Sequence, residues 1–165
     1  RFAKKRPIFP EPEGLLSEAP KILGLDGAQK MSKSRNNAIT LEASADETAK
    51  AVKRATTDSE RRITYDPVNR PAVSNLLLLI SLCSGERPEA IAERIGDGGG
   101  GALKNELTSV LNDTLAPLRA RRAELAKDAR AVVQSVLGKG NAKANAVADA
   151  TLDEVRAAMS MSYGV

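Results

Sequence analysis

The sequence predicts a mainly α-helical protein, in which a helical bundle follows a shorter segment rich in turns. The first 40 of the 165 residues hold four prolines and three glycines, which interrupt any regular period. From Thr40 onwards, apolar residues recur at helical spacing. Aromatic residues make up only 2% of the chain, so aliphatic side chains should pack the core. We therefore expect two parts, residues 1–40 and residues 41–165.

The first elements expected along the chain are a strand and a helix. Residues 21–25 are the one candidate strand. Ser44 and Glu47 have the three-residue spacing of a capping box, which predicts that a helix begins directly after Ser44. A polar connection should follow that helix over residues 56–71.

Glycines and prolines mark the joints between the next helices. Ser74 is the expected N-cap of an apolar helix that ends at Gly85. Pro88 fits the first turn of a short helix that runs to residue 95. The glycine-rich residues 96–101 should then form a flexible connector. A phosphate cradle is the alternative, but no strand precedes these glycines and no Gly-Lys-Ser/Thr string ends them.

Leucines and valines at spacings of three and four predict a long helix beyond the glycines. The residues that share its apolar face are Leu103, Leu107, Val110, Leu111, Leu115 and Leu118. Pro117 lies inside this pattern and should kink or split the helix near residues 114–116. The helical register continues to Leu137, and residues 138–140 should end it. A last, alanine-rich helix is expected over residues 142–159.

The residue counts exclude several chemistries. The chain has no histidine and one cysteine, so a Ser-His-Asp triad, a histidine general base and a His or Cys zinc site all lack their residues. Cys83 lies in the most apolar stretch and should be a small buried hydrophobe rather than a nucleophile. There is no secretory signal pattern and no apolar run of the roughly 20 residues that cross a bilayer. The cytoplasm is the expected compartment, and no membrane contact is expected.

The positive charge is concentrated near the start of the chain. Residues 1–40 carry eight basic and four acidic side chains, which accounts for the whole net charge of +4. Such an excess favours a polyanion nearby, either nucleotide phosphate or nucleic acid. A solvated basic face is the alternative.

One string carries chemistry: Lys30-Met31-Ser32-Lys33-Ser34, here called the lysine loop. Two lysines three residues apart, with hydroxyls between and beside them, can grip a polyphosphate. Their ammonium groups bind more strongly as charge builds on a leaving pyrophosphate, which favours the transition state. A lysine-serine surface loop without a ligand is the alternative. Asp58, Tyr65 and Asp66 either orient this loop or build a turn, and the turn is the favoured interpretation.

The lysine loop resembles the signature loop of class I aminoacyl-tRNA synthetases, and other segments narrow the resemblance to the bacterial tryptophanyl-tRNA synthetases. The similar segments are residues 9–10, 21–26, 37–41, 55–59, 63–66, 73–77 and 115–119. The resemblance implies that residues 1–40 are the end of a Rossmann-like catalytic domain, including its last strand and signature loop. Residues 41–165 would form the helical anticodon-binding domain.

The resemblance also implies which residues bind ATP, which would enter with Mg²⁺. Lys30 and Lys33 would bind the phosphates as the catalytic pair. Ser32 and Ser34 would support them, Met31 would flank the nucleotide, and the backbone of Ile22 would lie against adenine. The family's second ATP signature is built around histidines, which this chain lacks. We therefore expect the chain to supply part of an active site and to be inactive alone.

The substrates that the resemblance implies are L-tryptophan, ATP and tRNA(Trp), used by a complete enzyme that forms a homodimer. A basic patch could meet tRNA phosphates, or it could be a solvated helix face. Its members are Arg119, Arg121, Arg122, Lys127 and Arg130. The alternative function is a stand-alone helical module that binds tRNA or regulates without catalysis.

Overall fold

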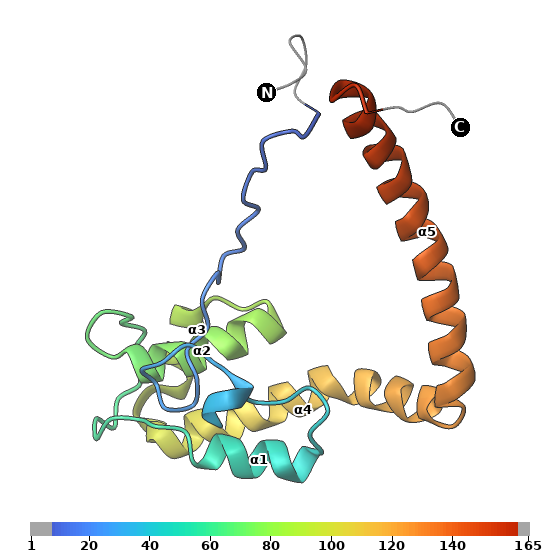
Figure 1. Ribbon diagram of the computed structural model, residues 1–165. Helices are drawn as coiled ribbons and strands as arrows, with labels where there is room; N and C mark the ends of the chain where they lie inside the picture. The colour runs from blue at the N-terminus through green and yellow to red at the C-terminus, as the bar shows by residue number, and fades with distance from the viewer. Residues whose placement is uncertain (1–7, 162–165) are drawn as a thin grey trace. The chain divides into compact units, whose positions relative to one another are not determined.

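The computed structural model describes residues 8–161, and helices dominate them (Figure 1). The mainly helical class is confirmed. Within the described residues, the only extended pairing is an isolated antiparallel bridge between Leu23 and Lys30. The helices are η1 (Lys33–Arg35), α1 (Ala45–Lys53), α2 (Pro71–Ser84), α3 (Pro88–Ile95), η2 (Gly96–Gly98), α4 (Gly99–Ala126) and α5 (Ala129–Ala158).

The chain divides into two compact units. The first, Ser17–Ala123, contains the lysine loop, α1 to α3 and most of α4. The second contains the described residues before Ser17 and after Ala123, including α5. Residues on both sides of position 40 therefore lie in the first unit. The functional division into residues 1–40 and 41–165 stays a prediction.

Helix α2 supplies the centre of the core in the first unit. Nine of its fourteen residues are Ala, Val, Leu, Ile or Cys, and it packs against α3. Leu77 and Ile80 are fully buried. The buried residues of the cluster are Val52, Ala55, Ile63, Val73, Leu76, Leu77, Leu79, Ile80, Ile91, Ala92, Leu103, Leu107 and Leu111. Cys83 is partly buried and packs against this cluster, in agreement with its predicted role as a small hydrophobe.

Three predicted helix ends are confirmed. The Glu47 N–H donates to Ser44 Oγ at 3.2 Å and the Ser44 N–H donates to the Glu47 carboxylate at 2.8 Å, which completes the capping box. Gly85 follows α2 with a φ of +78°, the left-handed conformation of a helix C-cap. Pro88 is the first residue of α3, where its missing N–H costs nothing.

Two predictions before α3 were wrong. Residues 21–25 form no strand, because the side chain of Asn75 takes both backbone groups of Leu23: Oδ1 accepts its N–H at 2.9 Å and Nδ2 donates to its carbonyl at 3.0 Å. Ser74 does not cap α2, which begins three residues earlier at Pro71. Its hydroxyl instead accepts the N–H of Asp66 at 2.8 Å.

The glycine-rich residues 96–101 do not form a flexible connector. They form η2 and the first turn of α4. A Cβ on Gly100 would lie 2.9 Å from Thr57 Oγ1, so the lack of a side chain allows close packing there. The phosphate-cradle alternative gains no support from this helical arrangement.

The expected interruptions of the later helices are also absent. Helix α4 continues through Pro117. Proline has no N–H to donate to the carbonyl of Asp113, four residues earlier, but Asp113 is exposed and water can take the place of that donor. Helix α5 continues through Gly138 and Gly140, because a glycine costs only about 1 kcal/mol in a helix and the neighbouring residues are strong helix formers. A break does occur between α4 and α5, where Asp128 caps α5 with its side chain.

Helix α5 differs from the others because it contains no buried residue. Buried residues of α1 to α4 share one hydrophobic core, and no residue of α5 belongs to it. No helix in residues 8–161 is both long and apolar enough to span a membrane.

The connection between α1 and α2 is held by Arg70, which is 8% exposed. Its guanidinium donates to both carboxylate oxygens of Asp58, at 2.7 and 2.6 Å, and to the carbonyl of Arg62 at 2.7 Å. Asp66 accepts the N–H groups of Val68 and Asn69 at 3.1 and 3.0 Å. Asp58 and Asp66 therefore build this connection, as the favoured interpretation predicted.

Candidate phosphate-binding site

The lysine loop begins at the end of a tight turn. The Gly24 N–H donates to the Gln29 carbonyl at 2.8 Å, and the Met31 N–H donates to the Ile22 carbonyl at 3.0 Å. These bonds flank the bridge between Leu23 and Lys30. The turn therefore fixes the direction in which the chain enters the loop.

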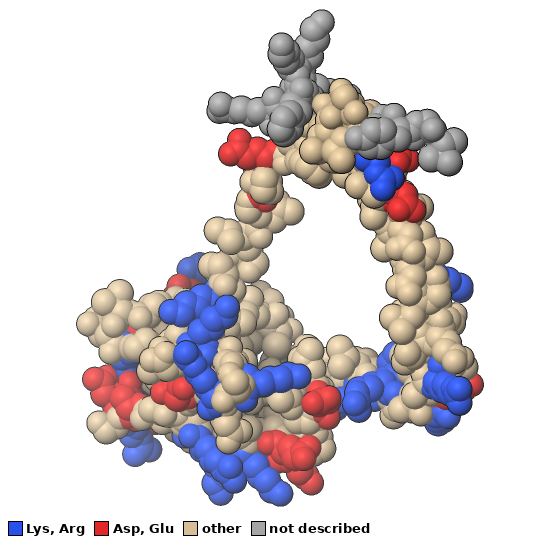
Figure 2. Space-filling view, in the orientation of Figure 1, with Lys and Arg blue, Asp and Glu red and all other residues tan. Residues whose placement is uncertain are grey.

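The loop directs its charged groups to solvent. Lys30, Lys33 and Ser34 are exposed, whereas Met31 and Ser32 are partly buried. The hydroxyls of Ser32 and Ser34 lie 2.9 Å apart. In the part of the chain that the structure describes, neither lysine forms an ion pair. Figure 2 shows Lys and Arg side chains gathered over this segment and over α1.

Asn37 lies buried beneath the loop with only 5% of its surface exposed. Its Oδ1 accepts the Ser32 N–H at 2.8 Å. Its Nδ2 donates to Asp26 Oδ2 at 2.6 Å and, more weakly, to the Lys30 carbonyl at 3.4 Å. A Cβ on Gly24 would lie 2.2 Å from this Nδ2, so only glycine leaves room for the amide.

Asp26 anchors the turn that precedes the loop. Its Oδ1 accepts the N–H groups of Ala28 and Gln29, each at 3.0 Å. The bond from Ala28, followed by those from Asn37 and Gln29, lowers the pKa of Asp26 below its ordinary value. Asp26 is therefore ionised at neutral pH and acts only as an acceptor.

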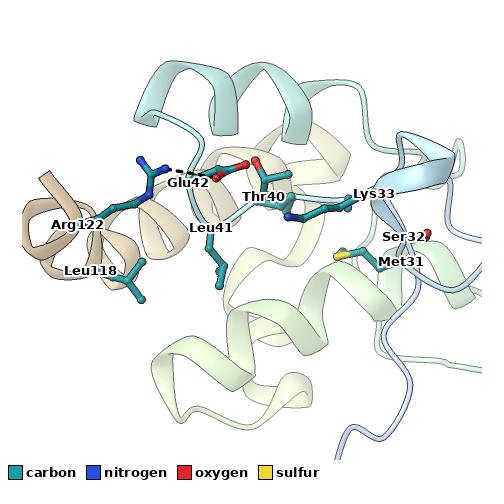
Figure 3. Close-up of a pocket in the computed structure, with 10 residues that line it drawn as sticks. Met31, Ser32, Lys33, Thr40, Leu41, Glu42, Leu118 and Arg122 are labelled. Atoms are coloured by element: carbon teal, nitrogen blue, oxygen red, sulfur yellow. Dashed lines mark ion pairs between the residues drawn. The ribbon is translucent and has the colours of Figure 1, made fainter. Parts of the chain in front are cut away.

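A cavity of about 370 Å³ lies beside the loop (Figure 3). Lys33 and Met31 extend from the loop in the same direction, with the Lys33 ammonium toward Thr40. An ion pair of 3.6 Å joins Glu42 to Arg122 of α4 on the other side. The lining residues are Met31, Ser32, Lys33, Ala38, Ile39, Thr40, Leu41, Glu42, Leu118 and Arg122.

The five residues of the predicted basic patch belong to both units and differ in burial. Arg119 is half-buried and donates to Thr48 Oγ1 of α1 at 2.8 Å and to Asn112 Oδ1 at 2.9 Å, so it ties α4 to α1. Arg121 and Arg122 are exposed on α4 of the first unit. Lys127 and Arg130 are exposed and belong to the second unit.

The sequence model of the family described as tRNA synthetases class I (W and Y) matches residues 1–116. The chain belongs to this family. The match includes the lysine loop, the Asn37 cluster and α1 to α3. It therefore confirms the resemblance on which the sequence-based interpretation depends.

Curated relatives of this class I synthetase family match the chain almost from end to end. The tryptophan–tRNA ligase of a Nostoc species is 36% identical over 170 residues, covering 100% of this chain and 50% of the relative. That of Halalkalibacterium halodurans is 35% identical, covering 98% of this chain and 50% of the relative. The chain thus spans about half the length of the curated relatives it matches.

Solved synthetase structures are similar in fold. The tryptophanyl-tRNA synthetase of Mycoplasma pneumoniae has a TM-score of 0.68 at 25% identity, covering 85% of this chain and 45% of that one. The enzyme of Campylobacter jejuni complexed with ADP and tryptophan has a TM-score of 0.65 at 25% identity, covering 93% and 48%.

Two residues that hold the lysine loop in place were not predicted from the sequence. Asn37 and Asp26 flank the loop at distances of three and four residues. The available signal was an Asp-Gly pair before the loop and an asparagine directly before an apolar run after it. That signal indicates turns, not which side chain reaches which backbone group.

Proposed function

We propose that this chain supplies the ATP-phosphate loop of a tryptophan–tRNA ligase. The complete reaction joins L-tryptophan to ATP as tryptophanyl-adenylate and transfers the amino acid to tRNA(Trp). The observation that carries the proposal is an exposed pair of lysines in a loop whose backbone is hydrogen-bonded to the buried side chain of Asn37, in a chain of the class I synthetase family. Curated relatives named tryptophan–tRNA ligase and a neighbour complexed with ADP and tryptophan support the choice of substrates.

Lys30 and Lys33 would act on the phosphates of ATP as the catalytic pair. Their ammonium groups are exposed, so oxygen ligands can replace the water around them. Negative charge grows on the leaving pyrophosphate as tryptophan attacks, and cations held nearby then bind it more strongly. Losing one such preorganised donor typically costs about 10²- to 10³-fold in rate.

Magnesium would enter with ATP as part of the substrate. Among residues 8–161, no group of three or more acidic or cysteine side chains is arranged to hold a metal ion. Mg²⁺ binds mainly to phosphate oxygens and water in such complexes, so no dedicated cage is required. The role of this chain is to neutralise the remaining phosphate charge.

The other loop residues would contact the nucleotide less directly. Ser32 and Ser34 offer hydroxyl and backbone donors beside the two lysines. Met31 lines the cavity next to the loop and would flank the nucleotide. The Ile22 carbonyl accepts the Met31 N–H and keeps a second lone pair, which leaves it able to contact adenine.

The assignment of the two functional parts belongs to the same proposal. Residues 1–40 would complete a Rossmann-like catalytic domain, and residues 41–165 would bind the anticodon end of tRNA. The exposed Arg121, Arg122, Lys127 and Arg130 would contact phosphates, whereas Arg119 holds α4 to α1. The complete enzyme would act in the cytoplasm as a homodimer.

The proposal is tested in the complete enzyme by measuring tryptophan-dependent exchange between ATP and pyrophosphate. We expect Lys33→Ala to lower the exchange rate at least tenfold, because one phosphate-binding cation is lost. Lys50→Ala, which removes an exposed lysine from α1, is the matched control and should stay within twofold. An unchanged rate for Lys33→Ala would overturn the assignment. A parent protein that binds tRNA but shows no exchange would favour the stand-alone binding module instead.

A further inference from the structure

We propose that Asn37 is the positioning residue of the lysine loop, with Asp26 as its anchor. Its side chain reaches one backbone group before Met31 and one after it: the Lys30 carbonyl at 3.4 Å and the Ser32 N–H at 2.8 Å. The peptide groups on both sides of Met31 are therefore fixed to one buried side chain. This inference rests on the proposed function, because the property that Asn37 positions is phosphate binding.

The cluster requires an amide at this position. Oδ1 must accept from Ser32 while Nδ2 must donate to the ionised Asp26, at 2.8 and 2.6 Å. A carboxylate could serve Ser32 but would face Asp26 with a second negative charge. An aliphatic side chain would leave the partly buried Ser32 N–H without its acceptor and would turn the exposed carboxylate of Asp26 to water, so neither contact would hold the loop.

The backbone around Asn37 is fixed as well, so its amide is held from both ends. The Leu25 N–H donates to the Asn37 carbonyl at 2.8 Å. Gly24 lies against the side chain so closely that any Cβ would collide with it. The turn at residues 24–29 and the loop thus form one polar cluster around Asn37.

Preorganisation explains how this cluster would affect catalysis. Lys30 and Lys33 are exposed and make no ion pair within residues 8–161, so the loop backbone determines where their ammonium groups can reach. A loop ordered before ATP arrives loses less conformational entropy on binding, and its charges lie where pyrophosphate charge develops. Asn37 itself touches no substrate in this scheme and acts through the two lysines.

The test uses a pair of complementary substitutions in the protein as its gene encodes it. Asn37→Asp should lower kcat/KM for ATP in pyrophosphate exchange at least tenfold, because two carboxylates then face each other. The KM for tryptophan should stay within twofold. The double variant Asp26→Asn with Asn37→Asp restores one donor opposite one acceptor but not the weak bond to the Lys30 carbonyl, and should recover kcat/KM to within fivefold of the parent.

The matched control is Asn69→Asp. Asn69 Nδ2 donates to Asp66 Oδ2 at 2.7 Å, which is the same pairing in a turn outside the loop. This variant should keep kcat/KM for ATP within twofold of the parent. An equal loss in the control and in Asn37→Asp would overturn the inference, since the effect would then be general destabilisation.

Two further outcomes separate this inference from the proposed function. If Asn37→Asp keeps the exchange rate of the parent while Lys33→Ala is impaired, only the positioning role of Asn37 is overturned. Lys33→Ala at the parent rate overturns the proposed function. If Asn37→Asp does not fold by circular dichroism, the double variant decides: a folded double variant that recovers exchange supports the inference, and one that stays at least tenfold impaired overturns it.

Discussion

Helices α4 and α5 are similar in length, with 28 and 30 residues, but they differ in what they bury. α4 buries four leucines spaced four residues apart, Leu103, Leu107, Leu111 and Leu115. α5 buries none of its residues, and Val136, Leu137 and Val147 remain 63%, 56% and 63% exposed. Helical spacing of apolar residues therefore predicts that a helix forms, but not that its apolar face is covered.

The two helices should draw their stability from different sources. Most helical stability in proteins comes from the packing of an apolar face. α4 has this contribution through the core of the first unit. α5 contains nine alanines and must depend more on the intrinsic preference of its residues for the helix. Substitutions of the same kind in the two helices should separate these contributions.

The largest expected difference comes from removing one leucine from each helix. Leu107→Ala leaves a cavity in the core and should lower the free energy of unfolding by about 2–5 kcal/mol. Leu137→Ala removes the same atoms from an exposed position and should change it by less than about 0.5 kcal/mol. Urea unfolding followed by circular dichroism measures both. Equal losses would show that the apolar face of α5 is covered in solution.

Features that depend on local chain chemistry could be predicted from the sequence, and features that depend on distant partners could not. The capping box of Ser44 and Glu47 and the start of α3 at Pro88 involve neighbours in the chain, so their spacing is visible. Asn75, by contrast, binds Leu23, which lies 52 residues away. No spacing rule predicts such a partner. The missing strand at residues 21–25 follows from that contact.

In the candidate site, the residues that would bind phosphate could be predicted from the sequence, but the residues that orient them could not. The lysines and serines of the loop are recognisable because their order is distinctive. The positions that orient them are single asparagine and aspartate residues, which also occur in many ordinary turns. Asn37 becomes distinctive only when its burial and its three partners are known.

Replacing a buried arginine of the first unit and an exposed arginine of α5 should give a smaller difference in the free energy of unfolding than the two leucine substitutions. Arg70→Met removes hydrogen bonds to Asp58, to the Arg62 carbonyl and to Thr64, and should lower the free energy of unfolding by about 1–3 kcal/mol at pH 7. Arg130→Met, at an exposed position of α5, should change it by less than about 0.5 kcal/mol. Urea titrations of the three proteins give these differences.

The pH dependence of the Arg70 effect has a definite sign. The hydrogen bond from Arg70 holds the pKa of Asp58 below its ordinary value. As the pH falls, Asp58 is therefore protonated in the unfolded chain before it is protonated in the folded one, near the ordinary aspartate pKa of about 3.9. The stabilisation is present above that pH and is lost as the pH falls through the folded-state pKa. The difference between the parent and Arg70→Met should narrow from pH 5 to pH 2, and a constant difference would contradict the role of the ion pair.

The smallest expected effect is an increase in stability, and it tests α5 directly. A Cβ on Gly140 would meet no atom within 4 Å, so Gly140→Ala should stabilise α5 by about 0.5–1 kcal/mol. Gly100→Ala in α4 should bring no such gain, because its Cβ would lie 2.9 Å from Thr57 Oγ1. Amide hydrogen exchange measured by NMR should slow in α5 for Gly140→Ala by about twofold to fivefold, the same free energy expressed as a rate ratio. Unchanged exchange would mean that contacts along α5, rather than helix propensity, determine its opening, and the contrast between the two helices would then disappear.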